Sequence, residues 1–422
     1  MQWLSYGQYL YPNLGKRIGI RQGIQPGSFG EGCDLGGERC LCQSPTTGHF
    51  SITFCKHTVS TLLLVPASRA GSKMIYVDGA QRSGSGTIVR YAVGLAALLG
   101  EELRLTNIRA RRDKPGLRPQ HLKAIEAVRE ICQGMLMGGE VGSGEITFKP
   151  GKAMSGGDYE WDIGTAGSTT MLAMTVLPPA CFAPKASSFR ITGGLFQDFA
   201  PSAYHMRHVL FPILAKMGIR AELAIIRPGY IPKGEGIIEV KVIPPGEKIR
   251  PLKLPEQGKL VKIEGIALSS HLRERKVSQR MAQKCSETLR ARGYDAQIEA
   301  IYDDTALQAG AALALYAQTD TGCIIGADMA GQPRRSSEEI ARYVAKTLLE
   351  DLSTGATVDR YLADQLILYT ALAQGQSEYR IPRMTEHVET NLWLVESILG
   401  AGVEVQEDLT IRIDGIGYSS RG

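Results

Sequence analysis

The chain has 422 residues and lacks the features that mark several specialised classes of protein. It contains no apolar run of the roughly 20 residues that a membrane-spanning helix needs, and Tyr91 to Leu99 is among its longest apolar runs. The first residues do not show the charged-then-apolar order of a secretory signal. We therefore expect a cytoplasmic protein with no membrane partner.

Charge of one sign is not in large excess either. The formal net charge is +5, which suits a phosphate-bearing partner but does not by itself indicate one. Hydrophobic residues make up 43% of the chain and charged residues 22%, which is ordinary for a folded globular protein. With this length, the composition predicts two or more domains that each bury a sizeable core.

The cysteines do not follow the paired C-x-x-C pattern of a zinc site. Four of them lie far apart along the chain, and we expect these to be reduced and buried: Cys132, Cys181, Cys285 and Cys323. The other four crowd the first 73 residues, where a metal knuckle is a minor alternative: Cys33, Cys40, Cys42 and Cys55.

Residues 1–73 differ in texture from the remainder of the chain. They are rich in Gly, Ser, Thr and Cys, and their apolar residues follow neither a helical nor a strand period. At Met74 the string Met-Ile-Tyr-Val-Asp-Gly predicts a buried strand that runs into a turn. We interpret 1–73 as an atypical N-terminal extension, either disordered or not truly part of the protein, with Met74 as the start.

A unit of strand, glycine-rich turn and helix recurs after Met74. The predicted strands of these units are Ile75–Val77, Tyr159–Ile163 and Phe189–Ile191, and a glycine-rich turn and a helix follow each of them. This alternation is typical of the α/β class. The repeats are too diverged to be proved from the sequence alone.

Residues 251–352 interrupt this texture. Their pattern predicts a small β-rich block with two helices, Arg275–Arg292 and Ser336–Leu352, and Ser336 with Glu339 makes a plausible capping box for the second helix. We expect 251–352 to be an inserted small α/β domain. The repeat domain is then discontinuous, comprising 74–250 and 353–422.

The glycine-rich turns are candidates for phosphate binding. Backbone N–H groups and the helix dipole favour an anion at such a turn, although many glycines only make the turn tight. Neither a GxxxxGK[ST] loop nor a well-placed GxGxxG strengthens this interpretation. The densest basic run, Arg109–Arg118, stops at a predicted helix start and also suits phosphate, the alternative being a solvated charged loop.

A histidine near the C-terminal end is a candidate for chemistry. His387 lies in a polar run just before an apolar-periodic segment, for which Thr390 or Asn391 can serve as the N-cap. A histidine on the turn before a helix is expected to be exposed and close to a site that favours anions. The common alternative is a surface histidine without a function.

A second polar stretch lies shortly before it, at Tyr361–Gln365. Asp364 and Gln365 stand beside an otherwise apolar run. Their side chains could recognise a nucleotide or a metal through hydrogen bonds, or they could form the solvated edge of a helix.

Together these segments resemble the RNA 3′-terminal phosphate cyclase family, from Met74 to about Gly415. The resemblance rests on the order and spacing of many matches rather than on any one motif. The matching strings are Asp78-Gly79-Ala80-Gln81 with Gly84, Gly86 and Arg90; Ile108-Arg109 with Arg112, Lys114-Pro115-Gly116-Leu117 and Gln120-His121-Leu122; Gly164 with Ala166-Gly167-Ser168; Arg227 to Gly236; Tyr361-Leu362-Ala363-Asp364-Gln365; and His387 with Thr390-Asn391.

The resemblance implies a fold and a reaction. The fold is one of repeated units, each with a four-stranded sheet and two helices, plus an inserted small α/β domain. In the reaction a histidine attacks the α-phosphorus of ATP, pyrophosphate leaves, and the adenylate passes to an RNA 3′-terminal phosphate. The neighbouring 2′-hydroxyl then displaces AMP and closes a 2′,3′-cyclic phosphodiester.

The resemblance also implies roles for residues. His387, in the H-x-x-T-N string, corresponds to the attacking histidine. ATP is the nucleotide, a divalent metal (Mg²⁺ or Mn²⁺) is expected to assist the leaving pyrophosphate, and the metal ligands remain unidentified. The residues implied to bind the nucleotide or a phosphate are Tyr361, Leu362, Ala363, Asp364, Gln365, Arg90, Arg109 and Arg112.

The chain departs from the family pattern at four positions. Ser83 stands where a glutamate, a metal ligand, is usual, and serine cannot replace its charge. Thr87 and Met174 replace glutamines, and Glu235 replaces the middle of three glycines. The main alternative is therefore a non-catalytic cyclase-like protein that binds RNA or assists ribosome assembly. A third possibility, an enolpyruvyl transferase on a related repeat fold, is disfavoured by His387 and by Tyr361–Gln365.

Overall fold

The computed structural model describes residues 74–151, 154–246 and 248–420. The predictions made for 1–73, including the cysteines there, lie outside these described residues. Within them the strands form four-stranded sheets in which the first two strands in sequence order are parallel and the later pairings are antiparallel. The third sheet of this kind is completed by strands on both sides of a long insertion.

The first repeat runs from Met74 to Lys149. Its sheet has the order β1-β2-β4-β3, and its two helices lie between the strands in sequence. Its elements are β1 (Met74–Asp78), α1 (Gly86–Leu99), β2 (Glu102–Thr106), α2 (Pro119–Ile131), β3 (Met135–Met137) and β4 (Ile146–Lys149).

The second repeat follows the same plan with the order β5-β6-β8-β7. Its second helix contains a π-helical segment, η1, between two α-helical parts. Its elements are β5 (Asp158–Asp162), α3 (Thr169–Ala180), β6 (Ser187–Gly193), α4 (Ala203–His205), η1 (Met206–Leu210), α5 (Phe211–Lys216), β7 (Arg220–Arg227) and β8 (Gly236–Ile243).

The third repeat has the order β15-β16-β14-β9, which is the same arrangement again. Its elements are β9 (Lys253–Leu254), α8 (Leu362–Gln365), α9 (Ile367–Leu372), β14 (Gln374–Arg380), α10 (Glu386–Leu394), η2 (Val395–Leu399), β15 (Gly402–Val405) and β16 (Thr410–Ile416). The predicted α/β fold of repeated four-stranded units with paired helices is therefore confirmed.

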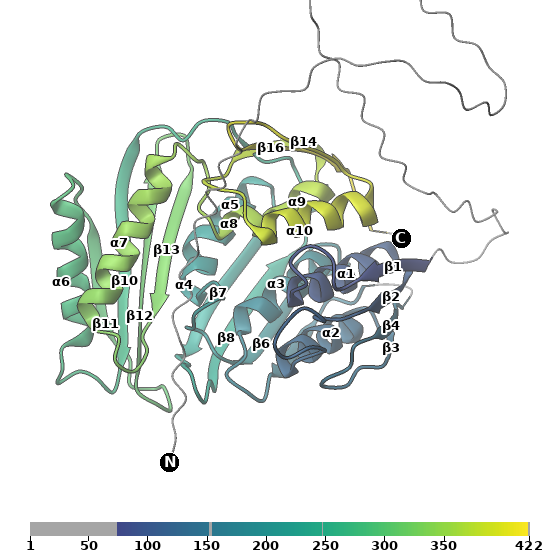
Figure 1. Cartoon of the computed structure of the whole chain (residues 1–422), viewed down its shortest axis with the longest axis horizontal. Helices are drawn as coiled ribbons and strands as arrows, with labels where there is room; N and C mark the ends of the chain where they lie inside the picture. The colour runs from purple at the N-terminus through teal and green to yellow at the C-terminus, as the bar shows by residue number, and fades with distance from the viewer. Residues whose placement is uncertain (1–73, 152–153, 247, 421–422) are drawn as a thin grey trace, which may run out of the picture. The chain divides into compact units, whose positions relative to one another are not determined.

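The insertion lies between β9 and α8 of the third repeat. Its sheet has the order β11-β10-β12-β13, and α6 and α7 pack against one face of it (Figure 1). A separate apolar core fills the space between the sheet and the two helices. Its elements are β10 (Leu260–Ser270), α6 (Val277–Arg290), β11 (Gln297–Tyr302), β12 (Gly310–Thr319), β13 (Ile324–Ala330) and α7 (Ser337–Ser353).

The edges of the insertion differ slightly from the range 251–352. Strand β9 lies inside that range but pairs with β14, so Lys253 and Leu254 belong to the third repeat. A strand of two residues is too short to show a period in the sequence, which is why the pattern did not separate it. The capping box of α7 is present, since Ser336 and Glu339 exchange their side-chain and backbone hydrogen bonds.

Helix α1 is the central helix of the first repeat. It contacts α2, α3 and α10, and nearly every residue from Gly86 to Leu98 is buried. An apolar surface all round explains this position. Arg90 is its single charged residue and is only 6% exposed. A cation in such a place needs a negatively charged or polar partner.

Two smaller predictions can also be checked. The cysteines at 132, 181, 285 and 323 are free and buried, which confirms the expectation that they are reduced. Among the helices of the described residues, none combines the length and the apolar composition that crossing a bilayer requires.

Candidate active site

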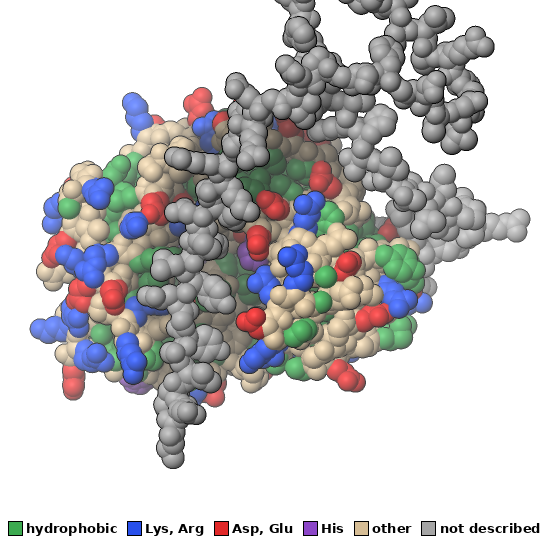
Figure 2. Space-filling view, in the orientation of Figure 1, with side chains coloured by type: hydrophobic (Ala, Val, Ile, Leu, Met, Phe, Trp, Pro, Cys, Tyr) green, Lys and Arg blue, Asp and Glu red, His purple; other side chains and the backbone are tan. Residues whose placement is uncertain are grey.

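A pocket of about 440 Å³ opens where the repeats meet the insertion. That volume lies in the usual range for a small-molecule site. Figure 2 shows the hollow, with Lys and Arg side chains and a histidine beside it. The lining residues come from α1, α3, the loop before α4, β13, α7, the stretch at α8 and α10: Thr87, Arg90, Tyr91, Met171, Met174, Gln197 to Pro201, Asp328, Met329, Tyr343, Tyr361, Asp364, Gln365 and His387.

His387 lies in the first turn of α10 and lines this pocket. The N-cap is Thr385, whose hydroxyl accepts a hydrogen bond from the N–H of Val388 at 3.2 Å. The prediction of Thr390 or Asn391 as the N-cap was therefore wrong. The helix begins before the predicted position because the Thr385 hydroxyl reaches the third helical N–H. Thr390 and Asn391 therefore lie inside the helix. The expected exposure of the His387 side chain is confirmed.

Thr390 and Asn391, the two polar residues that follow His387 in the H-x-x-T-N string, hold α10 in place. Thr390 Oγ1 accepts the N–H of Ser83 at 3.2 Å, which ties α10 to the first glycine-rich turn. Asn391 donates from Nδ2 to the carbonyl oxygen of Asp364 at 3.0 Å, which ties α10 to α8. Both are fully buried. They orient the helix that carries His387 against the two neighbouring segments of the pocket.

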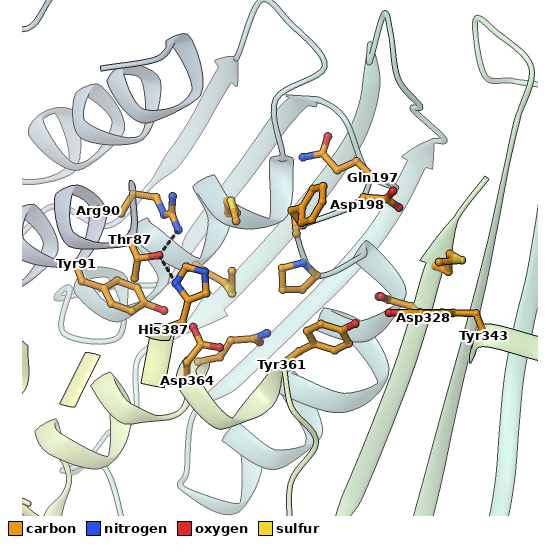
Figure 3. Close-up of a pocket in the computed structure, with 17 residues that line it drawn as sticks. Thr87, Arg90, Tyr91, Gln197, Asp198, Asp328, Tyr343, Tyr361, Asp364 and His387 are labelled. Atoms are coloured by element: carbon orange, nitrogen blue, oxygen red, sulfur yellow. Dashed lines mark hydrogen bonds between the residues drawn. The ribbon is translucent and has the colours of Figure 1, made fainter. Parts of the chain in front are cut away.

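One hydroxyl connects His387 to Arg90. Oγ1 of Thr87 lies 3.3 Å from Nδ1 of His387, and it accepts a hydrogen bond from the Arg90 guanidinium at 3.3 Å (Figure 3). Because Nδ1 is engaged, Nε2 is the ring nitrogen left for a ligand. Desolvation in the pocket, with the positive charges of Arg90 and Arg112, lowers the pKa of His387 below its ordinary value. The imidazole is therefore neutral at pH 7.

The first glycine-rich turn is packed closely against the basic loop. Ser85 is the N-cap of α1, and its hydroxyl bonds to that of Ser83 at 2.9 Å. A guanidinium nitrogen of Arg112 donates to the carbonyl oxygen of Ser83 at 2.9 Å. A Cβ atom at Gly86 would lie 2.1 Å from Nε2 of His121, so any side chain there would displace the buried His121 ring. The turn is thus held in place from both sides.

The three predicted arginines have different surroundings. Arg90 lines the pocket, and Arg112 is near enough to His387 to affect its pKa. Arg109 donates to the carbonyl oxygens of Lys114 and Gly116 at 2.7 and 2.9 Å, and so it braces the basic loop. It does not line the pocket. The structure therefore brings two of the three guanidinium groups to the histidine.

The stretch Tyr361–Gln365 meets the pocket through Tyr361, Asp364 and Gln365, while Leu362 and Ala363 are buried in the core. Desolvation raises the pKa of Asp364 to about 7, against the opposing charge of Arg90. Gln365 is 3% exposed, and neither its Oε1 nor its Nε2 has a protein partner. A buried amide without a hydrogen-bond partner among the described residues is costly.

Part of the pocket wall was not predicted from the sequence. Asp328 and Tyr343, from β13 and α7 of the insertion, lie across the pocket from His387 (Figure 3). The loop before α4 adds Phe199, which is fully exposed and has a positive φ of 65°. Asp328 could have been noticed in the sequence, since it interrupts an otherwise apolar strand. The sequence around Tyr343 and Phe199 gives no such indication, because only the folded chain brings these residues to the site.

The described residues offer little to a metal ion. They include no group of three or more His, Cys, Asp or Glu side chains that could hold one. Ser83 lies at the position where the resembling family has a carboxylate, and its hydroxyl is occupied by Ser85. A serine hydroxyl does not supply the anionic oxygen that Mg²⁺ or Mn²⁺ prefers. The divalent metal remains a prediction.

The comparisons with known proteins point in one direction. A family model described as RNA 3′-terminal phosphate cyclase matches residues 81–405. A protein of that name from Methanopyrus kandleri is 38% identical over 338 residues, which cover 79% of this chain and 95% of the relative. Relatives of the same name from Pyrococcus furiosus (36% identity, 79% and 95% covered) and Hyperthermus butylicus (35% identity, 82% and 99% covered) are also similar.

Proposed function

The chain belongs to the RNA 3′-terminal phosphate cyclase family, and from this premise we propose that it uses ATP to convert an RNA 3′-terminal phosphate into a 2′,3′-cyclic phosphodiester. One observation carries the proposal. His387 lines a pocket of suitable size as a neutral imidazole, with Nδ1 engaged by Thr87 and Nε2 free. A neutral imidazole that carries its proton on Nδ1 has a lone pair on Nε2 and is a competent nucleophile.

In the proposed first step, Nε2 of His387 attacks the α-phosphorus of ATP. The new N–P bond forms as the bond from that phosphorus to the bridging oxygen of the β-phosphate breaks, and pyrophosphate leaves. In this proposal the imidazole carries its proton on Nδ1, which lies 3.3 Å from Oγ1 of Thr87, and the proton stays there during the attack. The product is AMP linked covalently to the histidine.

In the next two steps the adenylate moves to the RNA. An oxygen of the RNA 3′-phosphate attacks the phosphorus of the linked AMP, and the N–P bond breaks. The adjacent 2′-hydroxyl then attacks the RNA phosphorus, loses its proton to solvent and expels AMP. Arg90 and Arg112 supply positive charge beside the histidine, where negative charge develops on the phosphoryl oxygens.

We further propose that Gln365 recognises the adenine. An amide presents one donor and one acceptor side by side, which matches the donor and acceptor along an adenine edge. Gln365 lines the pocket, and its buried amide atoms have no hydrogen-bond partner among the described residues, which supports this proposal. The partly buried ring of Tyr361 offers an apolar face to the same base.

The second candidate function is a non-catalytic RNA-binding or ribosome-assembly factor. The observation that favours it is Ser83, which brings no charge to the turn beside His387. In that case the pocket would bind nucleotide without forming a covalent bond to the histidine.

The deciding experiment is incubation of the purified protein with α-labelled ATP and Mg²⁺ or Mn²⁺, followed by a denaturing gel. We expect a labelled band that withstands base and is lost in acid, as a phosphoramidate is. His387→Ala should remove the band, whereas Glu389→Ala, an exposed change in the same helix, should keep it. A band that persists in His387→Ala, or no band in folded wild-type protein, would overturn the proposed mechanism.

A further inference from the structure

A buried carboxylate lies at the start of the stretch that lines the pocket. Oδ1 of Asp359 accepts the N–H groups of Tyr361 and Leu362, each at 2.8 Å. Oδ2 accepts the N–H of Gly326, on strand β13 of the insertion, also at 2.8 Å. One side chain therefore connects the first turn of α8 to the insertion.

His205 completes this connection from the second repeat. Its Nε2 lies 3.1 and 3.2 Å from the two oxygens of Asp359. The exposed fractions of the two side chains are 1% and 0%, so water does not compete for these bonds. Burial opposes a charge on either group, but each favours the charge of the other. The net effect raises the pKa of His205 and lowers that of Asp359.

The insertion uses the same strand to reach the pocket. Two residues after Gly326, Asp328 lines the pocket and accepts the N–H of Ser202 at 3.0 Å. Ser202 is in turn the N-cap of α4, the short helix that carries His205. The second repeat, the insertion and the start of α8 are thus joined within a few residues of one pocket wall.

We infer that His205 and Asp359 are positioning residues which hold Tyr361 and the start of α8 against the insertion, and that they thereby set the affinity of the pocket for ATP. This inference rests on the proposed function. It also assigns a role to the insertion, because β13 provides both the anchor at Gly326 and the pocket residue Asp328. Neither His205 nor Asp359 lines the pocket.

If His205 and Asp359 had only a structural role, their loss would have a different effect on the kinetics. It would lower the stability of the whole protein and the amount of active enzyme, but it would not change KM for ATP. Loss of a positioning pair should raise KM for ATP more than it lowers kcat, since Tyr361 is displaced and His387 is not. The split between KM and kcat therefore separates the two roles.

The first test is Asp359→Asn in the full chain. The amide keeps one oxygen for the N–H groups of Tyr361 and Leu362, but its NH₂ group then faces the N–H of Gly326. A buried donor left without an acceptor changes an equilibrium by about tenfold or more, so we expect KM for ATP in the labelling reaction to rise by about tenfold, with kcat within about threefold of wild type. The matched control is Glu378→Gln, a 22% exposed carboxylate of β14 that pairs with Arg412 and does not line the pocket.

The second test replaces His205. His205→Gln retains a donor near the position of Nε2, and His205→Leu removes it at similar volume. We expect His205→Leu to raise KM for ATP by about tenfold and His205→Gln to restore most of the affinity. Folding of each variant is checked by its thermal unfolding.

The outcomes are distinguishable from those for the proposed function. If folded wild-type protein forms no adduct, the proposed function fails before any variant is tested. If the wild type forms the adduct and Asp359→Asn matches the KM of Glu378→Gln, the positioning role is overturned and the proposed function stands. Equal effects of His205→Gln and His205→Leu on KM would also overturn it.

Discussion

Replacing Thr87 by valine removes the hydroxyl that connects His387 to Arg90 and keeps the shape of the side chain. Both contacts of Oγ1 measure 3.3 Å, which is long for hydrogen bonds. Leaving a buried partner unpaired costs about 1–3 kcal/mol, and the long distances favour the lower half of that range. A loss of about 1.4 kcal/mol in transition-state stabilisation corresponds to a rate about tenfold lower.

The assay is single-turnover transfer of label from α-labelled ATP to the protein, followed over time at saturating ATP. We expect Thr87→Val to slow formation of the adduct about tenfold. Thr87→Ser keeps the hydroxyl and serves as the matched control, with a rate within about threefold of wild type. If Thr87→Val labels as fast as Thr87→Ser, the hydroxyl does not set the tautomer of His387, and our account of the nucleophile is refuted.

Two further predictions concern the base and the charge of the pocket. Gln365→Glu replaces the donor of the amide with an acceptor, so we expect the ratio of kcat/KM for ATP over GTP to fall by about tenfold or more; competition labelling with the two nucleotides measures it, and an unchanged ratio contradicts the role of Gln365. Arg112→Gln removes a positive charge that lowers the pKa of His387, so that pKa should rise. Since the neutral imidazole is the reactive form, the acid limb of the pH–rate profile should move to higher pH, and an unmoved limb in labelling at several pH values contradicts the electrostatic account.

The repeats could be predicted because each element carries its own local signal. Strand β1 and helix α1 are both largely apolar, and a glycine-rich turn with Ser85 marks the boundary between them. The signal was weaker where elements are short or irregular. Strand β9 has two residues, and the π-helical segments η1 and η2 continue an α-helical period that hides them.

The site could be predicted only in part. The resemblance to a family identified more of its residues than the local sequence patterns did. The residues next to His387 in the sequence do not distinguish it from an ordinary surface histidine. Its candidate role depends on Thr87 and Arg90, which are far away in the sequence. Asp359 was missed for the same reason. A polar residue before a short helix looks like an ordinary cap until the partners from Gly326 and His205 are visible.

The contact between Thr87 and His387 spans 300 positions of the chain. A cell synthesises the residues at the two ends of this contact at different times, since the N-terminal residues emerge from the ribosome first. The first repeat, which carries Thr87 and Arg90, is therefore made before α10, and its contact with His387 forms only after α10 has been synthesised. A chain that ends before α10 lacks His387 and therefore cannot form the complete pocket. Binding of a nucleotide to the pocket would stabilise the complete fold relative to any of its separate repeats.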